Sequence, residues 1–331
     1  MILAGDVGGT TTRIGLFERA PVRPRPVVVR LFMTLDHPDL DTVLTAFLAE
    51  CRTVGAPGVG DIDAACFGVA GPIVGGTARL TNAPWVVDAG EVATRLGAPV
   101  ALLNDLEAMA CAVPVLENSE LHMLQAGTPE SGGTVALIAA GTGLGEAVLY
   151  RVGGRLVPAA TEGGHADWAA RSERDIDMLR GLTTRFGRAE IEQVISGPGL
   201  LNLHRLTHPS PCQAAKGNDP ASVSASAIDR RCPGCVEALD LFVEAYGAEA
   251  GNLALRTMAT GGVFVGGGIA PKILPALDDG RFLRAFLAKA PFEALMARIP
   301  VKVILHPEAG LLGAAVHAAR DIAPPGSDLR A

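Results

Sequence analysis

The chain has 331 residues, 49% of them hydrophobic and 19% charged, which is enough apolar sequence for two domains and argues against extensive disorder. The 28 Lys and Arg against 35 Asp and Glu give a net charge of -7, which disfavours nucleic acids and anionic membranes as partners. No leader peptide and no apolar stretch of membrane-spanning length is recognised, and six scattered cysteines do not resemble a disulfide framework, so the sequence predicts a cytoplasmic protein with reduced thiols.

The first third of the chain alternates predicted strands and helices, which is typical of an α/β domain with a mixed sheet. It opens with a β-hairpin, whose strands at residues 2–7 and 13–17 flank a Gly8-Gly9 turn. From the spacing of apolar residues, further strands are predicted at 27–32, 64–69 and 100–103, and helices at 40–51, between 88 and 97, and at 106–110.

Pro114 ends the last of these helices, and the polar segment 117–133 is the predicted domain junction. The opening pattern then returns, with strands at 134–140 and 144–150 around a glycine turn. Two such hairpins predict a duplicated architecture with a cleft between the halves. Later elements are predicted as helices at 172–186, 235–258 and 311–319, strands at 263–265 and 301–305, a surface loop at 207–223 and a frayed tail after Ile322.

Three glycine-rich loops follow predicted strands, and a loop without Cβ atoms lets backbone N–H groups approach phosphate oxygens. Asp6, at the end of the first strand, is placed to hold a hydrated Mg²⁺ ion. Each loop alone could be an ordinary turn, but three in comparable positions favour nucleotide phosphates, and neither a P-loop nor a Rossmann motif is present. The candidate phosphate-binding residues are Gly5, Asp6, Val7, Gly8, Gly9, Thr10 and Thr11 in the first loop, Gly141, Thr142 and Gly143 in the second, and Gly266, Gly267 and Gly268 in the third.

Asp105 follows a short strand and opens a helix, where the helix N-terminus favours an ionised carboxylate. Such a carboxylate is able to accept the proton of a hydroxyl group, although a helix cap is the simpler interpretation of an isolated Asn-Asp pair.

Together these segments resemble the actin-like ATPase superfamily of sugar kinases, and within it the bacterial glucokinase family. The resemblance runs in family order from near residue 1 to about 320. The matching segments are Gly5-Asp6-Val7-Gly8-Gly9-Thr10, Leu80-Thr81-Asn82-Ala83-Pro84-Trp85, Leu103-Asn104-Asp105, Gly141-Thr142-Gly143-Leu144-Gly145, Glu162-Gly163-Gly164-His165-Ala166-Asp167, Ser196-Gly197-Pro198-Gly199-Leu200 and Gly310-Leu311-Leu312-Gly313.

The resemblance implies a two-domain actin-like ATPase (ribonuclease H-like) α/β fold with a cleft between a smaller and a larger domain. The smaller domain is expected at 1–114 plus about 305–322, and the larger at 115–304. It also implies an ATP- and Mg²⁺-dependent glucokinase, which forms a homodimer and transfers the γ-phosphate to the 6-hydroxyl of glucose.

Within that family Asp105 is the catalytic base. The residues expected to bind glucose are Asn82, Asn104, Asp105, Glu162, His165 and Glu192. Without the resemblance, His165 would be taken as a loop histidine, and Glu192, on a helix expected at 189–195, as a solvated charge. Glu146 stands where relatives are expected to have an apolar residue.

Alternatives remain at this stage. Another hexose (mannose, fructose or N-acetylglucosamine) or a polyphosphate donor would fit the same motifs, and a sugar-sensing regulator or a structural actin-like protein is a more distant alternative. Cys232 and Cys235 suggest either two thiols at a helix start, the favoured interpretation, or a metal or redox pair that His204, His208 and Cys212 would complete.

Overall fold

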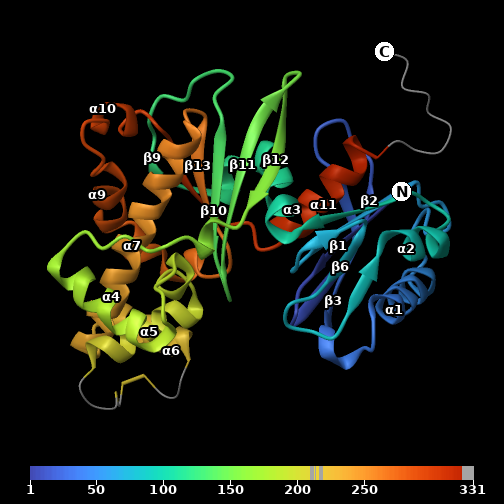
Figure 1. The fold of residues 1–331 in the computed structure, drawn as a ribbon. Coiled ribbons are helices and arrows are strands. Elements are labelled where there is room, and N and C mark those ends of the chain that lie inside the picture. The colour runs from blue at the N-terminus through green and yellow to red at the C-terminus, as the bar shows by residue number, and fades with distance from the viewer. Residues whose placement is uncertain (209–211, 213, 216–218, 323–331) are drawn as a thin grey trace. The chain divides into compact units, whose positions relative to one another are not determined.

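The computed structural model describes residues 1–208, 212, 214–215 and 219–322, which fold into two compact units (Figure 1). Unit 1 consists of Met1–Leu116 and the segment that begins at His306; unit 2 is Glu117–Leu305. Each unit has its own β-sheet with helices packed against it, so the predicted α/β class is confirmed.

The main sheet of unit 1 has the strand order β3-β2-β1-β4-β8. β1 pairs antiparallel with β2 and parallel with β4, β2 pairs antiparallel with β3, and β4 pairs parallel with β8. A small sheet, β5-β6-β7, was not predicted because its strands are only two or three residues long. The strands are β1 (Ile2–Val7), β2 (Thr11–Glu18), β3 (Arg25–Met33), β4 (Ala64–Val69), β5 (Ile73–Val74), β6 (Thr77–Arg79), β7 (Val86–Asp88) and β8 (Val100–Asn104), and the helices are α1 (Leu40–Thr53), α2 (Ala89–Leu96), α3 (Asp105–Ala112) and α11 (Ala309–Arg320).

Helices bury both faces of this sheet. Successive side chains of β1 point to opposite faces of the sheet. Leu3 therefore packs in a core with one face of α1, and Ile2 and Ala4 pack in a second core with α3 and α11. Fully covered parallel strands of this kind have nearly continuous apolar sequences, as β4 does.

The sheet of unit 2 has the order β12-β11-β10-β13-β14-β9. Its first five strands repeat the order and pairing directions of β3-β2-β1-β4-β8, so the duplicated architecture predicted from the two hairpins is observed. The long helix α7 (Pro233–Thr257) lies beside α5 and α9 (Figure 1). The strands are β9 (Leu121–Gln125), β10 (Val135–Ala140), β11 (Leu144–Val152), β12 (Arg155–Thr161), β13 (Gly262–Gly266) and β14 (Val301–Ile304), and the other helices are α4 (Glu173–Phe186), α5 (Gly197–Thr207), α6 (Pro220–Ile228), α8 (Leu274–Leu277), α9 (Arg281–Leu287) and α10 (Glu293–Met296).

Helix ends follow the capping chemistry of the sequence. Asp39, Asp88 and Ser172 each accept a hydrogen bond from a backbone N–H in the first turn of α1, α2 and α4. Gly97 ends α2 in the left-handed conformation, at φ 65°.

Three local predictions differ from the structure. The polar junction 117–133 contains the edge strand β9, which pairs antiparallel with β14. The predicted loop 207–223 gives way to helix α6 at Pro220, and several of its residues lie outside the described ranges. Glu192 lies on a single 3-10 turn, Ile191–Gln193, instead of a helix, because Ser196 caps α5 directly afterwards.

Candidate functional site

The first glycine loop is a tight connection between β1 and β2. The Gly8 N–H donates to the Thr11 carbonyl (3.0 Å), and the Thr34 hydroxyl donates to the Gly8 carbonyl (2.8 Å). A Cβ on Gly9 would lie 2.6 Å from the Asn82 Cβ, so the structure brings Asn82 against this loop. Gly5 is inside β1, where a Cβ would lie 2.3 Å from the Phe67 ring, so the absence of a side chain there serves packing.

Asp6 lies at the end of β1, beside the start of α11. Burial raises the pKa of its carboxyl group; nearby Arg13 opposes that shift, and Glu308 adds to it. A Cβ on Gly310 would lie 3.2 Å from the Asp6 carboxylate, so this glycine leaves room beside it. A nearby cation stabilises the ionised form of a buried carboxylate. Mg²⁺ commonly binds proteins through one or two carboxylates and water. Asp6 with Glu308 therefore fits this ion.

Asp105 is the first residue of α3. Asn104 forms the N-cap: its side chain accepts from the Leu106 N–H (2.9 Å), while Glu107 accepts from the Asn104 N–H (3.2 Å). The Asp105 carboxylate also accepts from the Leu106 N–H (2.9 Å). The helix is therefore capped by Asn104 and Glu107, and the carboxylate of Asp105 stands at the positive end of the helix dipole.

Helix α11 packs closely against α3. A Cβ on Gly313 would lie 1.6 Å from the Ala108 carbonyl oxygen, and one on Gly68 of β4 would lie 2.6 Å from the Ala108 Cβ. α3 is thus held closely between a strand and a helix at two glycines, and Asp105 is placed by rigid backbone.

The second and third glycine loops lie together in unit 2, at the carboxyl ends of the neighbouring parallel strands β10 and β13. Gly267 has φ +83°, and a Cβ there would lie 2.3 Å from the Ala140 carbonyl oxygen. The buried hydroxyl of Tyr246, on α7, joins both strands: it accepts from the Ala140 N–H (3.2 Å) and lies 3.4 Å from the Gly266 carbonyl. Loops after the carboxyl ends of parallel strands are the usual ligand sites of such sheets.

Glu192 is held on the second glycine loop. Its carboxylate accepts from the Leu144 N–H (2.8 Å), and a Cβ on Gly143 would lie 2.6 Å from the same oxygen. The Gly197 N–H at the start of α5 donates to the Gly141 carbonyl (2.8 Å). The loop therefore depends on a carboxylate and a helix start far along the chain.

His165 lies among carboxylates. Its Nδ1 is 2.9 Å from Glu190 Oε2, and its Nε2 is 4.0 Å from Glu162 Oε2. The hydrogen bond to Glu190 raises the pKa of His165, and the negative charges of Glu192 and Glu162 act in the same direction. Arg188 holds Glu190 in place through a 2.6 Å ion pair.

Sequence reasoning missed Glu190 at this site. Its only sequence signal is a second carboxylate two residues before Glu192, and its pairing with His165 joins residues 25 positions apart.

Glu146 lies beneath the loop that carries Glu162 and His165. A Cβ on Gly163 would lie 2.2 Å from Glu146 Oε2, and the side chain is 2% exposed. Burial and the neighbouring Glu249 raise the pKa of Glu146 to about 8. The Arg256 guanidinium, 3.8 Å from Glu146 Oε2, opposes part of this shift. Glu146 thus supports the loop of Glu162 and His165 as a neutral acid near pH 7.

Glu146→Gln is expected to raise the stability of the protein in alkaline solution. The pKa of the folded state lies above the ordinary 4.5, so the folded chain holds a proton that the unfolded chain releases, and stability falls as pH rises through this interval to about 8. The neutral amide removes that loss. Melting temperatures between about pH 6 and 9 should therefore fall less in Glu146→Gln than in the parent.

The exposed Glu18→Gln at the end of β2 is the matched control, and it should follow the parent. Equal pH slopes in Glu146→Gln and the parent would contradict the assignment.

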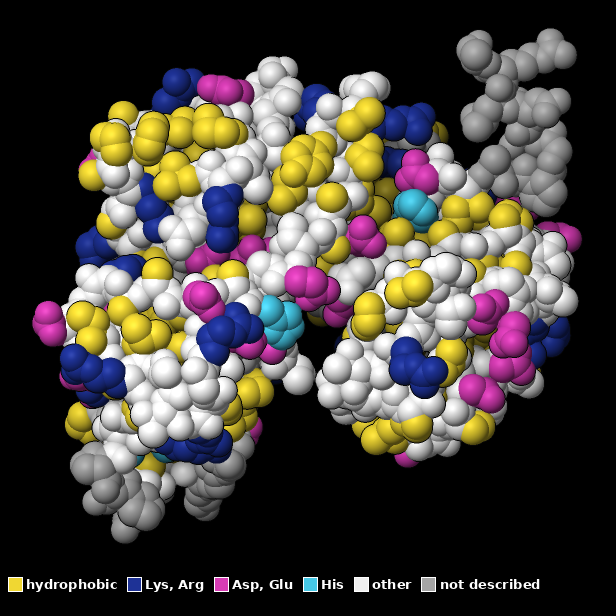
Figure 2. Space-filling view, in the orientation of Figure 1, with side chains coloured by type: hydrophobic (Ala, Val, Ile, Leu, Met, Phe, Trp, Pro, Cys, Tyr) yellow, Lys and Arg dark blue, Asp and Glu magenta, His cyan; other side chains and the backbone are white. Residues whose placement is uncertain are grey.

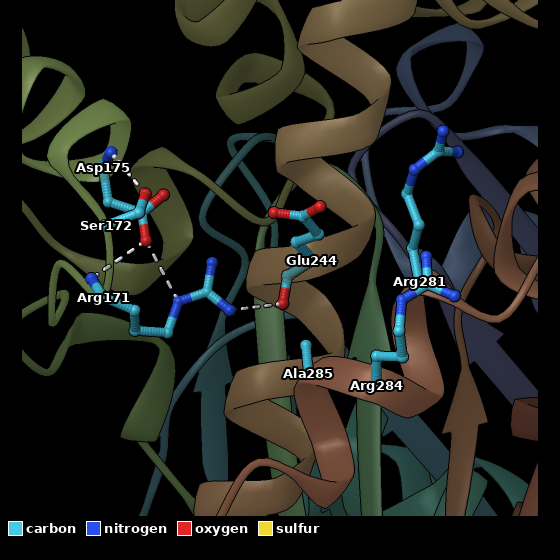
Figure 3. A pocket seen from close by; sticks show the side chains of 7 residues that line it. All are labelled: Arg171, Ser172, Asp175, Glu244, Arg281, Arg284 and Ala285. Atoms are coloured by element: carbon cyan, nitrogen blue, oxygen red, sulfur yellow. Dashed lines mark hydrogen bonds and ion pairs between the residues drawn. The ribbon is translucent and has the colours of Figure 1, made fainter.

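A pocket of about 240 Å³ elsewhere in unit 2 contains none of these residues. Figure 3 shows the Arg171 guanidinium donating to Asp175 (3.1 Å) and to the Glu244 carbonyl (3.0 Å). Arg281, on α9, pairs with Asp240 (2.9 Å). Because carboxylates already neutralise these cations, we assign the pocket no substrate. Its lining residues are Arg171, Ser172, Asp175, Glu244, Arg281, Arg284 and Ala285.

On the face drawn in Figure 2, the Lys and Arg side chains of the described residues stand in small groups among acidic ones and form no continuous basic surface. Across the described ranges, every helix is too short or too polar to pass through a bilayer.

The sequence profile named Glucokinase matches residues 3–321. A glucokinase of Nostoc punctiforme is 37% identical over 97% of this chain and 99% of its own length. The crystal structure of a glucokinase from an Antarctic psychrotroph superposes with a TM-score of 0.83 at 29% identity, covering 96% of this chain and 98% of the other.

A ROK family glucokinase from Streptomyces griseus, solved in complex with glucose and AMPPNP, has the same fold at a TM-score of 0.64 and 22% identity, covering 96% of this chain and 98% of the other. The predicted actin-like sugar kinase fold is thereby confirmed.

Proposed function

The chain belongs to the glucokinase family, and from that premise we infer that it transfers the γ-phosphate of ATP to the 6-hydroxyl of glucose, giving glucose 6-phosphate and ADP. The observation that carries this inference is the family match over residues 3–321, nearly the whole chain. The 34–39% identity to several glucokinases over at least 95% of the chain supports the same activity.

The three glycine loops bind the phosphates in this proposal. In unit 1 these are Gly8, Gly9 and Thr10, and in unit 2 Gly141–Gly143 together with Gly266–Gly268. The exposed Thr10 and Thr142 offer hydroxyl donors. Gly268, where an added Cβ would meet nothing within 4 Å, offers its backbone N–H. Asp6 would hold a hydrated Mg²⁺ ion, and such an ion would supply positive charge to neutralise the phosphates.

Asp105 is the base in this proposal. It accepts the proton of the 6-hydroxyl as that oxygen bonds to the γ-phosphorus and the bond from the γ-phosphorus to the bridging oxygen breaks. The N-terminus of α3 favours the ionised carboxylate that this role requires.

The remaining hydroxyls of glucose need groups that donate and accept hydrogen bonds. We assign Asn82 and Asn104 of unit 1, and Glu162, His165 and Glu192 of unit 2, to these hydroxyls. His165 is half-exposed, and its acidic neighbours raise its pKa and so favour the protonated ring, which donates hydrogen bonds. Glu162 is exposed and offers acceptor oxygens.

A cytoplasmic location and a homodimer are part of the same proposal, and both rest on the family resemblance. Light scattering of the purified chain tests the dimer.

The activity is tested with a panel of sugars, with ADP release as the readout. Glucose should give the highest kcat/KM with ATP, and mannose, fructose and N-acetylglucosamine much lower values. A higher kcat/KM for one of those sugars, or for polyphosphate over ATP, would replace glucose or ATP in the proposal.

Glu190→Gln is expected to move the pH dependence of glucose binding to lower pH. The uncharged amide replaces a charge-assisted hydrogen bond to His165 with a weaker neutral one, so the pKa of His165 falls and the imidazole loses its proton sooner as pH rises. As pH rises, the KM for glucose should increase at a lower pH in the variant than in the parent. At a pH where the parent still has its low-pH KM for glucose, the variant KM should be severalfold higher, with the KM for ATP little affected.

Asp167→Asn is the matched control, because Asp167 also pairs with Arg188 and the His165 hydrogen bond is made by Glu190. A profile of Glu190→Gln that coincides with that of the parent would remove Glu190 from the sugar site.

A further inference from the structure

Five side chains of metal-binding types gather in unit 2, and none of them belongs to the glycine loops or to the loop of Glu162 and His165. His204 and His208 lie at the carboxyl end of α5, Cys212 follows it, and Cys232 and Cys235 open α7. Ligand atoms of His204, His208, Cys212 and Cys235 lie within 4.8 Å of one another. Figure 1 shows α5, α6 and α7 side by side in this region.

The sulfur and nitrogen atoms of four of these residues have tetrahedral spacing. Cys212 Sγ is 3.6 Å from both Cys232 Sγ and Cys235 Sγ, and His208 Nε2 is 3.1 Å from Cys232 Sγ and 4.0 Å from Cys235 Sγ. Four ligands around zinc, with Zn–S and Zn–N bonds of about 2.3 and 2.0 Å, are separated by about 3.5–3.8 Å. The two sulfur–sulfur separations of 3.6 Å lie within this interval, while the two nitrogen–sulfur separations lie below it (3.1 Å) and above it (4.0 Å).

We propose that Cys212, Cys232, Cys235 and His208 bind a structural Zn²⁺ ion. Three thiols release their protons to solvent as the ion binds. The two cysteines of Cys232-Pro233-Gly234-Cys235 have the two-residue spacing of zinc ligand pairs, and His208 and Cys212 form the second pair.

The histidine is already oriented for a metal. His208 Nδ1 is 2.8 Å from the His204 carbonyl oxygen; donation to this acceptor puts the proton on Nδ1 and leaves the Nε2 lone pair toward the cysteines. Gly234 makes room for the ring, since a Cβ there would lie 2.5 Å from His208 Cε1. The Thr207 hydroxyl donates to the Gly234 carbonyl (2.9 Å) and ties the end of α5 to the start of α7.

Two further observations favour a metal over unrelated thiols. His204 Nε2 is buried and has no hydrogen-bond partner among the described residues, beside a cluster that a cation would neutralise. The Ala215 N–H points at Cys212 Sγ (3.4 Å), a contact that stabilises a thiolate. A disulfide would use only two of the three sulfurs, which stand 3.6 Å apart against about 2.05 Å for an S–S bond.

The segment that contains α6 lies between the two ligand pairs, so such an ion would hold both ends of that segment at the start of α7. Because α7 packs against α5, α6 and α9, its first turn anchors much of the helical layer of unit 2. A zinc ion that binds the folded chain but not the unfolded chain stabilises the folded state.

The test uses the full chain with its affinity tag removed. After expression with zinc, elemental analysis should find about one zinc ion per chain. Removal by a chelator should lower the melting temperature by several degrees, and added zinc should restore it. Cobalt should replace zinc and give the intense near-ultraviolet absorption of thiolate-to-cobalt charge transfer.

Cys232→Ser, at a half-buried position, should lower zinc affinity at least about a hundredfold, and His208→Ala should do the same. Gly234→Ala, which keeps all ligands but displaces the His208 ring, should weaken binding less. Cys51→Ser, at a buried cysteine of unit 1, is the matched control and should keep one zinc ion per chain.

Three results would overturn the proposal. The reduced chain would take up neither zinc nor cobalt; the isolated protein would be lighter by two hydrogens, with a disulfide among these cysteines as its only stable form; or His204→Ala would lose the zinc while His208→Ala kept it.

Discussion

Asp105→Asn is expected to lower kcat by about 10²- to 10⁴-fold while leaving glucose affinity within a few-fold of the parent. The amide keeps the size and the hydrogen bond to the Leu106 N–H, but it cannot accept the proton of the sugar hydroxyl. Steady-state kinetics give kcat, and calorimetric titration with glucose gives the affinity.

The fold should survive this change because Asn104 and Glu107, not Asp105, cap α3. The control is Asp41→Asn, in the first turn of α1, which removes a carboxylate from a comparable helix position and should leave kcat unchanged. If Asp105→Asn kept near-parent turnover, another group would have to serve as the base.

Gly313→Ala is expected to be strongly destabilising. The new methyl group would lie 1.6 Å from the Ala108 carbonyl oxygen and 2.9 Å from the Ala112 nitrogen, both of them backbone atoms of α3 that cannot move aside as a side chain would. Overpacking of this kind costs about 3 kcal/mol, and the displaced α3 carries Asp105 with it. We expect a lower urea midpoint and a lower kcat together.

Gly60→Ala provides the comparison, since a Cβ at Gly60 meets nothing within 4 Å and should change stability by less than about 0.5 kcal/mol. A Gly313→Ala midpoint as close to the parent as that of Gly60→Ala would show that α11 can withdraw from α3 at little cost.

The elements predicted most closely are those with strong local signals. β4 has the predicted bounds because its run of apolar residues is fully buried, and α4 begins at its Ser172 cap. The edge strand β9 was missed because none of its residues is fully buried, and its polar residues resemble a linker until β14 pairs with it.

The candidate site was predicted from motifs, and the motif residues stand in strands, loops and helices of both units. The sequence contained no indication that Glu192 would hold the second glycine loop through the Leu144 N–H, or that Glu146 would support Gly163 from beneath. Both contacts join segments distant along the chain, which no local pattern encodes.

The metal-binding cluster illustrates the same division. Cys232 and Cys235 could be recognised as a pair by spacing alone, whereas the approach of His208 and Cys212 depends on how α5 packs beside α7.

By itself, the sequence determined the longer buried strands, the helix caps, the glycine turns and, through its motifs, the family, because each depends on neighbouring residues. The assignment of Asp105 as the base stays a prediction. Tertiary packing alone decided which charges meet, which carboxyl groups lose water and which glycines carry close contacts. Those properties depend on distances and burial between segments far apart in the chain, and these are set only when the helices pack on the two sheets.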